Sequence, residues 1–227
     1  IAYLHGKNVR ERAMELISIS HPKFRPWLID EARRLNFIFK DQAFIEGKAG
    51  EYPENLETYR TIKSGEEVLL RPVKISDEPL LKDFFYSLSD ESLQRRFMSM
   101  KKSIPHERLQ EMVVIDYTQD MVILAVNIEE EIEEVVGIGQ FSIDEVSHTA
   151  DVAFAVRDDW QGKGVGTELM KYLTILAKKR GLLGFTADVL ADNWGMLRVF
   201  NKMGFNMEKH FEAGAYELRM TFKDTKS

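Results

Sequence analysis

Cysteine is absent from the 227 residues of this chain. That absence excludes disulfide bonds, thiolate metal sites and a cysteine nucleophile supplied by the chain itself. The five histidines form neither H-x-x-x-H nor H-x-E, the spacings by which neighbouring side chains hold a metal ion. The composition therefore predicts a protein without a metal centre.

Long apolar runs and basic runs are also missing. No stretch is apolar over the length needed to cross a bilayer, and no signal peptide is evident at the start, so we expect a cytoplasmic protein with no membrane partner. The net charge is -6, and no run of lysine and arginine could follow a phosphate backbone, which argues against nucleic acid as a partner. The 44% hydrophobic and 30% charged residues are typical of a globular chain.

A strand, a glycine-rich loop and a helix follow one another in the second half of the chain. The run Val152–Val156 is apolar and partly β-branched, which favours a strand. After Gly166 the apolar residues recur with the spacing of an amphipathic helix, at Leu169, Leu173, Leu176 and Ala177. Gly181 supplies a helix stop.

The loop between that strand and helix has the sequence Gln161-Gly-Lys-Gly-Val-Gly166. The first amides of a helix lack partners within it, and glycine lets a ligand approach the backbone, so phosphate or pyrophosphate can bind there. A plain turn that only connects strand to helix is the alternative. The loop does not match G-x-x-x-x-G-K-S/T. It also fails the dinucleotide pattern G-x-G-x-x-G, because the last position counted from Gly162 holds Thr167.

Residues 1–46 predict two helices that stand apart from the rest. Asn8 or a neighbour could cap the first, which ends at His21-Pro22 because proline disfavours a helical residue before it. The second runs from about residue 22 to 37. Such a hairpin is too small for a core of its own, so we expect an appendage. Residues 47–66 show no sustained period, and we interpret them as a surface linker.

Residues 67–222 predict one domain, followed by a short tail at 223–227. Its elements come in the order βα(αα)βββαβαβ. This order predicts the α/β (α+β) class, with a mixed central sheet flanked by helices.

Particular residues within the domain predict where elements begin and bend. Asp77, or the serine before it, is an N-cap candidate for the first helix, Pro105 suits the first turn of a later one, and Asn193 caps the last. Gly137 and Gly139 lie inside a strand. A bulge or a close backbone approach explains them better than a phosphate loop.

Two motifs spaced along this domain resemble the GNAT N-acetyltransferase superfamily. Gln161, Gly164 and Gly166 fit its acyl-CoA signature Q/R-x-x-G-x-G/A. The segment from Asn193 to Phe205, NWGMLRVFNKMGF, is similar to N-x-x-A/S-x-x-L/V-Y/F-x-K-x-G-F. The resemblance covers about residues 67–222 and implies the GNAT fold. Short phrases further resemble the GNAT domains of bacterial protein-lysine acetyltransferases, namely Leu70-Arg-Pro72, Asp77-Glu-Pro79 and Asp116-Tyr117.

The start of the chain resembles a different family. The segment Ala2–Ala13, followed by His21-Pro-Lys-Phe24, is similar to the C-terminal end of the acetyl-CoA hydrolase/CoA-transferase family. This resemblance implies a longer natural protein with a CoA-transferase body upstream. The catalytic glutamate of that family has no counterpart here, so we expect no transferase chemistry from the tail.

The GNAT resemblance implies acetyl-CoA as cosubstrate and names the residues that hold it. Asn193 touches the pantetheine arm, and Phe200 stands where many members have a tyrosine acid. Along the preceding strand, where it splays from its neighbour, the pantetheine pairs with Phe154, Ala155 and Val156. The pyrophosphate lies on the loop that follows, formed by Gln161, Gly162, Lys163, Gly164, Val165, Gly166 and Thr167.

The implied reaction is direct attack of an amine, with protein lysine as the expected acceptor, on the thioester. A lysine amine with a pKa of about 10.4 is mostly protonated at pH 7, which costs about 4.6 kcal/mol, so a general base matters more than an acid. Asp151 is the expected base, where related enzymes have glutamate; an exposed strand-end carboxylate is the alternative. Glu145 is a second candidate. Tyr216 could replace the missing acid, or be a half-buried strand aromatic.

Two other classes of function compete with this one. The domain could bind acetyl-CoA and report its level to a fused CoA-transferase body without transferring the acetyl group, which Phe200 and the short side chain of Asp151 favour. It could also be a protein-interaction scaffold without a ligand.

Overall fold

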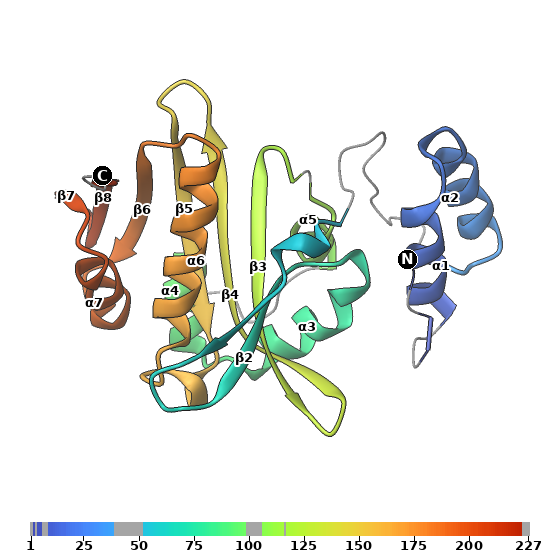
Figure 1. Cartoon of the computed structure of the whole chain (residues 1–227), viewed down its shortest axis with the longest axis horizontal. Helices are drawn as coiled ribbons and strands as arrows, with labels where there is room; N and C mark the ends of the chain where they lie inside the picture. The colour runs from blue at the N-terminus through green and yellow to red at the C-terminus, as the bar shows by residue number, and fades with distance from the viewer. Residues whose placement is uncertain are drawn as a thin grey trace.

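The computed structural model describes residues 2, 4–5, 9–38, 52–98, 106–115 and 117–223. An eight-stranded sheet runs through the domain, and helices cover both of its faces (Figure 1). The strand order is β1-β2-β3-β4-β5-β6-β8-β7. The expectation of a mixed sheet flanked by helices is therefore confirmed.

Most elements of the described residues lie where the sequence patterns predict them. The α-helices are α1 (Val9–Ile19), α2 (Arg25–Arg34), α3 (Glu78–Ser87), α4 (Asp90–Phe97), α5 (His106–Val113), α6 (Val165–Lys179) and α7 (Trp194–Lys202). The short 3-10 helices are η1 (Pro22–Phe24), η2 (Glu54–Leu56), η3 (Ile75–Asp77) and η4 (Asp158–Trp160). The strands are β1 (Thr58–Thr61), β2 (Glu67–Pro72), β3 (Asp120–Glu129), β4 (Ile132–Asp144), β5 (Thr149–Val156), β6 (Gly184–Leu190), β7 (Asn206–Glu212) and β8 (Ala215–Thr221). None of these helices is both long and apolar enough to span a membrane.

The sheet has a gap near its middle. All neighbouring strands pair antiparallel except β5 and β6, which run parallel over only three residues, from Thr149–Gly184 to Asp151–Thr186. Beyond these pairs β5 stays bonded to β4 as far as Val156, while β6 stays bonded to β8. The two strands consequently separate after Asp151.

Helix α6 packs very closely on the sheet face opposite to α3, α4 and α5. A Cβ added to Gly137 would lie 2.8 Å from Val165 Cγ1, and one on Gly139 would lie 3.0 Å from Leu173 Cδ1. The register of β3 against β4 also shifts next to Gly137. Both features expected of these glycines, a bulge and a close approach, are confirmed.

A buried ion pair joins β2 to η3. Arg71 is 1% exposed, and its guanidinium donates to both oxygens of Asp77 at 2.6 and 3.0 Å. Asp77 stands at the N-cap position of α3 as expected, but its carboxylate caps no α3 amide; it accepts instead from the Lys74 N–H at 2.6 Å. Glu133 of the β3–β4 hairpin accepts from Arg71 at 2.7 Å, so this cluster fastens the hairpin to the sheet.

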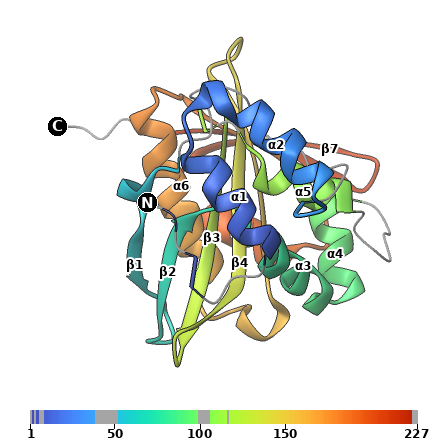
Figure 2. The same cartoon turned by 90° about the vertical axis from the view of Figure 1, so that its right-hand side faces the viewer.

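The N-terminal helices form the expected hairpin and lie against one end of the domain (Figures 1 and 2). Met14, Ile17 and Ile29 belong to a small hydrophobic cluster against which Ile75 of the domain packs, so the hairpin does not close its core alone. The hydroxyl of Ser76 in η3 donates to Glu15 of α1 at 2.8 Å, which attaches the hairpin to the domain. Three residues singled out in the sequence lie outside the described residues: Asn8, Pro105 and Asp116.

The expectation of a linker over residues 47–66 is wrong in part. Residues 47–51 lie outside the described residues, but Thr58–Thr61 form β1, which pairs antiparallel with β2. Its side chains alternate between half-buried and exposed, and only one of the four is a large apolar-bodied residue, Tyr59. Threonine and tyrosine favour strands, but a run of four residues is short, and pairing with β2 makes it a strand. The sheet therefore starts at residue 58.

Candidate active site

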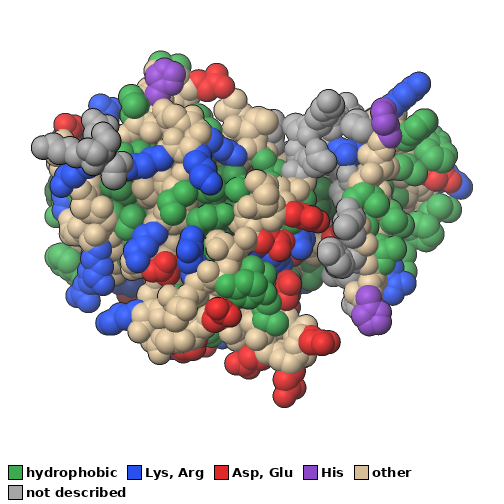
Figure 3. Space-filling model, in the orientation of Figure 1, with side chains coloured by type: hydrophobic (Ala, Val, Ile, Leu, Met, Phe, Trp, Pro, Cys, Tyr) green, Lys and Arg blue, Asp and Glu red, His purple; other side chains and the backbone are tan. Residues whose placement is uncertain are grey.

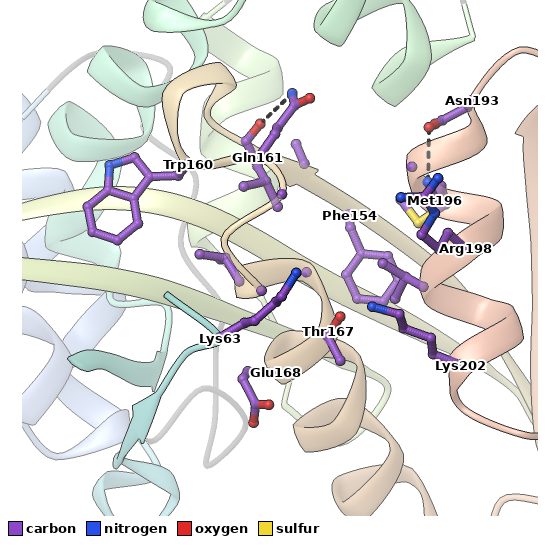
Figure 4. A pocket seen from close by; sticks show the side chains of 18 of the residues that line it. Lys63, Phe154, Trp160, Gln161, Thr167, Glu168, Asn193, Met196, Arg198 and Lys202 are labelled. Atoms are coloured by element: carbon purple, nitrogen blue, oxygen red, sulfur yellow. Dashed lines mark hydrogen bonds between the residues drawn. The ribbon is translucent and has the colours of Figure 1, made fainter. Parts of the chain in front are cut away.

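A groove of about 700 Å³ lies at the gap between β5 and β6. Its walls come from α4, the start of α6, α7 and the β1–β2 turn (Figure 4). Most of the residues expected to hold an acyl carrier line it, namely Phe154, Ala155, Val156, Gln161, Gly162, Gly164, Val165, Gly166, Thr167 and Asn193.

The loop before α6 takes a backbone conformation that favours glycine. Gly162 has φ +76° and Gly164 has φ +112°, both in the left-handed region. A Cβ on Gly164 would also lie 2.8 Å from the backbone nitrogen of Lys63. The Ser64 N–H donates to the Lys163 carbonyl at 3.2 Å. Local conformation and contact with the β1–β2 turn together hold the loop in place.

The N–H groups at the start of α6 are available to a ligand. The N–H groups of Thr167 and Glu168 are exceptions, because they donate to the Gly164 carbonyl at 3.0 and 3.1 Å. Within the described part of the chain, the amides from Gly162 to Gly166 donate to no protein acceptor. Unpaired amides at a helix start, supported by the helix dipole, attract anions. This end of the groove can therefore hold a phosphate or diphosphate.

Basic side chains surround these amides. Lys63, Arg198 and Lys202 line the groove, and Lys63 and Lys202 extend toward the start of α6 from opposite sides (Figure 4). None of the three forms an ion pair with a described carboxylate, whereas Lys171 pairs with Glu168 at 2.7 Å. Three uncompensated cations favour a ligand with several phosphate charges. None of the three was among the predicted ligands, although Lys202 stands at the lysine position of the second motif. Lys63 is about 100 residues from the loop, so no local pattern links it to the anion site.

Gln161 and Asp158 connect the loop to α4. Gln161 Nε2 donates to the Val156 carbonyl at 3.2 Å and to Ser92 Oγ at 3.1 Å. The Asp158 carboxylate accepts from the amide and hydroxyl of Ser89, both at 2.9 Å, and from the Ser92 hydroxyl at 2.7 Å. Burial opposes the charged form, but these hydrogen bonds outweigh it and lower the pKa of Asp158. Asp158 was not among the predicted site residues, because its partner Ser89 lies 69 residues away in the sequence.

Besides the two base candidates, three of the expected site residues do not line the groove. Phe200 is 1% exposed, and its ring packs on Phe154 with centroids 6.0 Å apart, so it supports the groove wall from behind. The Lys163 amine lies 4.4 Å from the ring centroid of Trp160, outside the groove. Tyr216 packs against Phe211 at 5.2 Å.

Asn193 is placed as expected at the start of α7. Its side-chain oxygen accepts from the Met196 N–H at 3.2 Å (Figure 4), which confirms the N-cap. The same residue lines the groove. A single side chain thus caps the start of α7 and lies at the groove wall.

Asp151 lies where β5 and β6 part, and is exposed at the surface. Partial desolvation by the surrounding protein and the nearby Asp188 raise the pKa of its carboxyl above the usual range, while Arg96 and Thr186 act in the opposite direction. A carboxylate with a raised pKa is a better proton acceptor near neutral pH. Asp151 does not itself line the groove, but Arg96, which interacts with it, does.

Glu145, the second base candidate, lies in the β4–β5 turn. It accepts a hydrogen bond from Gln119 at 2.7 Å and is not part of the groove. The described residues also contain no group of three or more histidine, aspartate and glutamate side chains that could hold a metal ion.

Comparisons with known proteins agree with this geometry. A sequence model of the acetyltransferase (GNAT) family matches residues 85–205, and one of the acetyl-CoA hydrolase/transferase C-terminal domain matches residues 1–32. The crystal structure of the GNAT domain of S. lividans PAT superposes with a TM-score of 0.69 at 26% identity, covering 76% of this chain and 100% of that one.

Two curated relatives are similar over much of the sheet domain. Acetyltransferase Pat of Mycolicibacterium smegmatis is 33% identical over 144 residues, which is 63% of this chain and 42% of the relative. Acetyltransferase PA5475 of Pseudomonas aeruginosa is 26% identical over 166 residues, which is 73% of this chain and 86% of the relative. The chain thus spans less than half the length of the first relative.

Proposed function

The chain belongs to the acetyltransferase (GNAT) family, and we propose that it transfers the acetyl group of acetyl-CoA directly to an amine, with a protein lysine as the acceptor. The observation that carries the proposal is the groove at the β5–β6 gap. One end holds the unpaired amides at the start of α6, and the other reaches Arg96, beside the carboxylate of Asp151.

The chemistry of acetyl-CoA suits this groove. Its diphosphate matches the amides of Gly162–Gly166, and its remaining phosphate charge matches Lys63, Arg198 and Lys202. The pantetheine arm carries amide groups that can pair with the backbone of β5. After Asp151, the side of β5 that faces β6 has no described strand paired with it. A carrier bound in this direction brings its thioester toward the point where the strands part.

Asp151 is proposed as the general base. A lysine acceptor arrives as an ammonium and must lose one proton before its nitrogen attacks the thioester carbonyl, and we assign that proton to the Asp151 carboxylate, directly or through a water molecule. The C–S bond then breaks, and the departing thiolate takes the second proton of the nitrogen. With Phe200 buried and Tyr216 outside the groove, no described tyrosine supplies an acid, and the thiolate is a stable enough leaving group to depart without one.

Release of free thiol from acetyl-CoA, measured with the full chain and lysine peptides, tests the proposal. Asp151→Asn is expected to lower kcat about 10²-fold or more while leaving acetyl-CoA affinity unchanged. Glu145→Gln is the matched control, because it neutralises an exposed carboxylate near the same strand but outside the groove; it should stay within about twofold of the unaltered chain. Equal losses in the two variants would refute the assignment of the base.

A non-catalytic acetyl-CoA sensor is the alternative, and the missing tyrosine hydroxyl at Phe200 favours it. A saturating carrier, at about 100 times its dissociation constant, adds about 2.7 kcal/mol of stability in either case. Thermal protection without thiol release from any amine would support the sensor. No protection at all would contradict both functions.

The N-terminal helices suggest a partner. Residues 1–32 match the acetyl-CoA hydrolase/transferase C-terminal domain, and we propose that a CoA-transferase body packs on them. In support, large apolar side chains are exposed on this small hairpin, namely Val9, Leu16, Ile19, Phe24, Trp27, Leu35 and Phe37. Replacing Trp27, which is 64% exposed, with serine should leave thiol release unchanged but weaken co-purification with such a body.

A further inference from the structure

Asp188 is the first residue of β6 that lies beyond the last β5–β6 pair and on the same sheet face as Asp151. Asp151 pairs with Thr186, and side chains alternate along a strand, so Thr186 and Asp188 share the face of Asp151. The residues between them, such as Ala187, belong to the core under α6. Across the gap from Asp188, β5 carries Ala153, whose methyl group leaves room.

The two carboxylates therefore flank the point where the strands part, on the face covered by α4. Both side chains are exposed, and they are close enough to interact electrostatically. The groove reaches the same face, since Arg96 of α4 and Ala155 of β5 line it. A thioester brought to the strand separation would consequently meet an acceptor that arrives from the Asp151 and Asp188 side.

Arg96 places a buried donor at this end of the groove, beside Asp151. Its Nε atom is buried and has no hydrogen-bond partner among the described residues. Burial and the neighbouring Arg108 lower the pKa of Arg96 to about 10, with Asp151 acting in the opposite direction, so the side chain is cationic at neutral pH. Buried donors are normally paired in folded proteins, and a ligand oxygen would satisfy this one.

Other charges face the same region from β8. Glu217 pairs with Asp188 and Arg219 pairs with Thr186, so both lie one strand further from the gap than β6. Among these groups, only Asp151 and Asp188 flank the gap itself.

We propose that Asp188 and Asp151 together bind the ammonium group of the acceptor, Asp188 holding it in position while Asp151 removes the proton. The inference rests on the proposed function and refines it, because it assigns the residue that distinguishes a cationic acceptor such as lysine from a neutral amine. An aromatic amine, which is neutral at pH 7, has no positive charge for Asp188 to hold. Asp188 is thus a specificity-determining residue.

The test compares two acceptors and two variants in the full chain at pH 7. In Asp188→Asn, the ratio of kcat/KM for a lysine peptide to kcat/KM for a neutral aromatic amine should fall at least tenfold, mainly through a higher KM for the peptide. Glu217→Gln, which removes the adjacent charge one strand away, should change that ratio less than threefold. Asp188→Glu, which keeps the charge, should recover most of the preference for lysine.

Calorimetry with an alkylammonium ion and CoA-saturated protein gives a readout that needs no turnover. The unaltered chain should bind the ion at least tenfold more tightly than Asp188→Asn, with equal CoA affinity. An unchanged acceptor ratio, or equal ammonium binding, overturns the role of Asp188 even if transfer occurs. Absence of thiol release with every amine overturns the proposed function. In that case the difference in ammonium binding between the unaltered chain and Asp188→Asn still tests whether Asp188 binds the ammonium group.

Discussion

Replacing Gly164 with alanine tests the loop that the proposed function depends on. Gly164 has φ +112° and precedes α6 as its N-cap. An added Cβ would lie 2.8 Å from the backbone nitrogen of Lys63 and 3.0 Å from its Cβ. Because the first of these atoms belongs to the backbone, the clash cannot be relieved by a side-chain rotation.

The expected loss of stability has two parts. A left-handed conformation costs a residue other than glycine about 1–2 kcal/mol, and forcing apart packed atoms costs about 1–3 kcal/mol. Together these destabilise the chain by about 2–5 kcal/mol. For a protein of this size, each kcal/mol lowers the Tm by about 2–4 °C, so Gly164→Ala should lower it by roughly 4–20 °C.

Gly162→Ala is the matched control, measured by the same thermal unfolding with and without acetyl-CoA. Gly162 also has a positive φ, +76°, but a Cβ there would meet nothing within 4 Å. Only the backbone term applies, and the Tm should fall by roughly 2–8 °C. Protection by acetyl-CoA should be weaker in Gly164→Ala than in the control. Equal Tm values for the two variants would show that contact with Lys63 does not hold the loop.

Three further predictions concern packing and charge. Gly137→Ala should destabilise the chain by about 1–3 kcal/mol in chemical denaturation, because a Cβ at residue 137 would lie 2.8 Å from Val165 Cγ1. Adding Val165→Ala to this variant should recover part of the lost stability. If the losses of the two single variants simply add in the double variant, this contact is not the cause. In chemical denaturation at pH 7, Asp158→Asn should cost about 0.5–1 kcal/mol, because the hydrogen bonds of this carboxylate lie at an exposed side chain. The pKa of Asp158 is lowered on folding, so its contribution should be present above about pH 4 and disappear as the pH falls through the folded value. The pKa of Asp151 is raised instead, so its negative charge disfavours folding as the pH rises. Asp151→Asn should therefore be more stable than the unaltered chain at pH 7, by less than about 1 kcal/mol because the side chain is exposed. At pH 3, where the carboxyl is protonated, the variant should show no gain in stability.

Local sequence predicted those parts of the site that depend on neighbouring residues. The glycine loop before α6 was predictable because positive φ angles and free helix-start amides are properties of a few consecutive residues. Asn193 accepts from the amide of Met196 at 3.2 Å, and an asparagine cap needs only the next turn of helix.

The errors come from interactions across the fold. β1 was missed because its strand-favouring threonines and tyrosine span only four residues, and its partner β2 is a separate segment of the chain. Aspartate is a residue type that often caps helices, yet the carboxylate of Asp77 accepts from the buried Arg71 instead of an α3 amide. Phe200 occupies the motif position expected to face the carrier, but it packs on Phe154 beneath the groove. Which face of α7 is buried depends on how the helix packs on the sheet, and the motif alone does not contain that information.

The sequence by itself determined that a strand, an anion-binding loop and a helix follow one another, because hydrophobic period, glycine positions and caps act within a few residues of chain. Only the tertiary structure decided which charges meet at the gap. Lys63, Arg96, Asp158 and Asp188 come from four separate elements. Lys63 and Arg96 line the groove, Asp158 holds the loop to α4, and Asp188 lies beyond the last β5–β6 pair. These positions follow from strand pairing and helix packing between segments far apart in the sequence, which no local pattern contains.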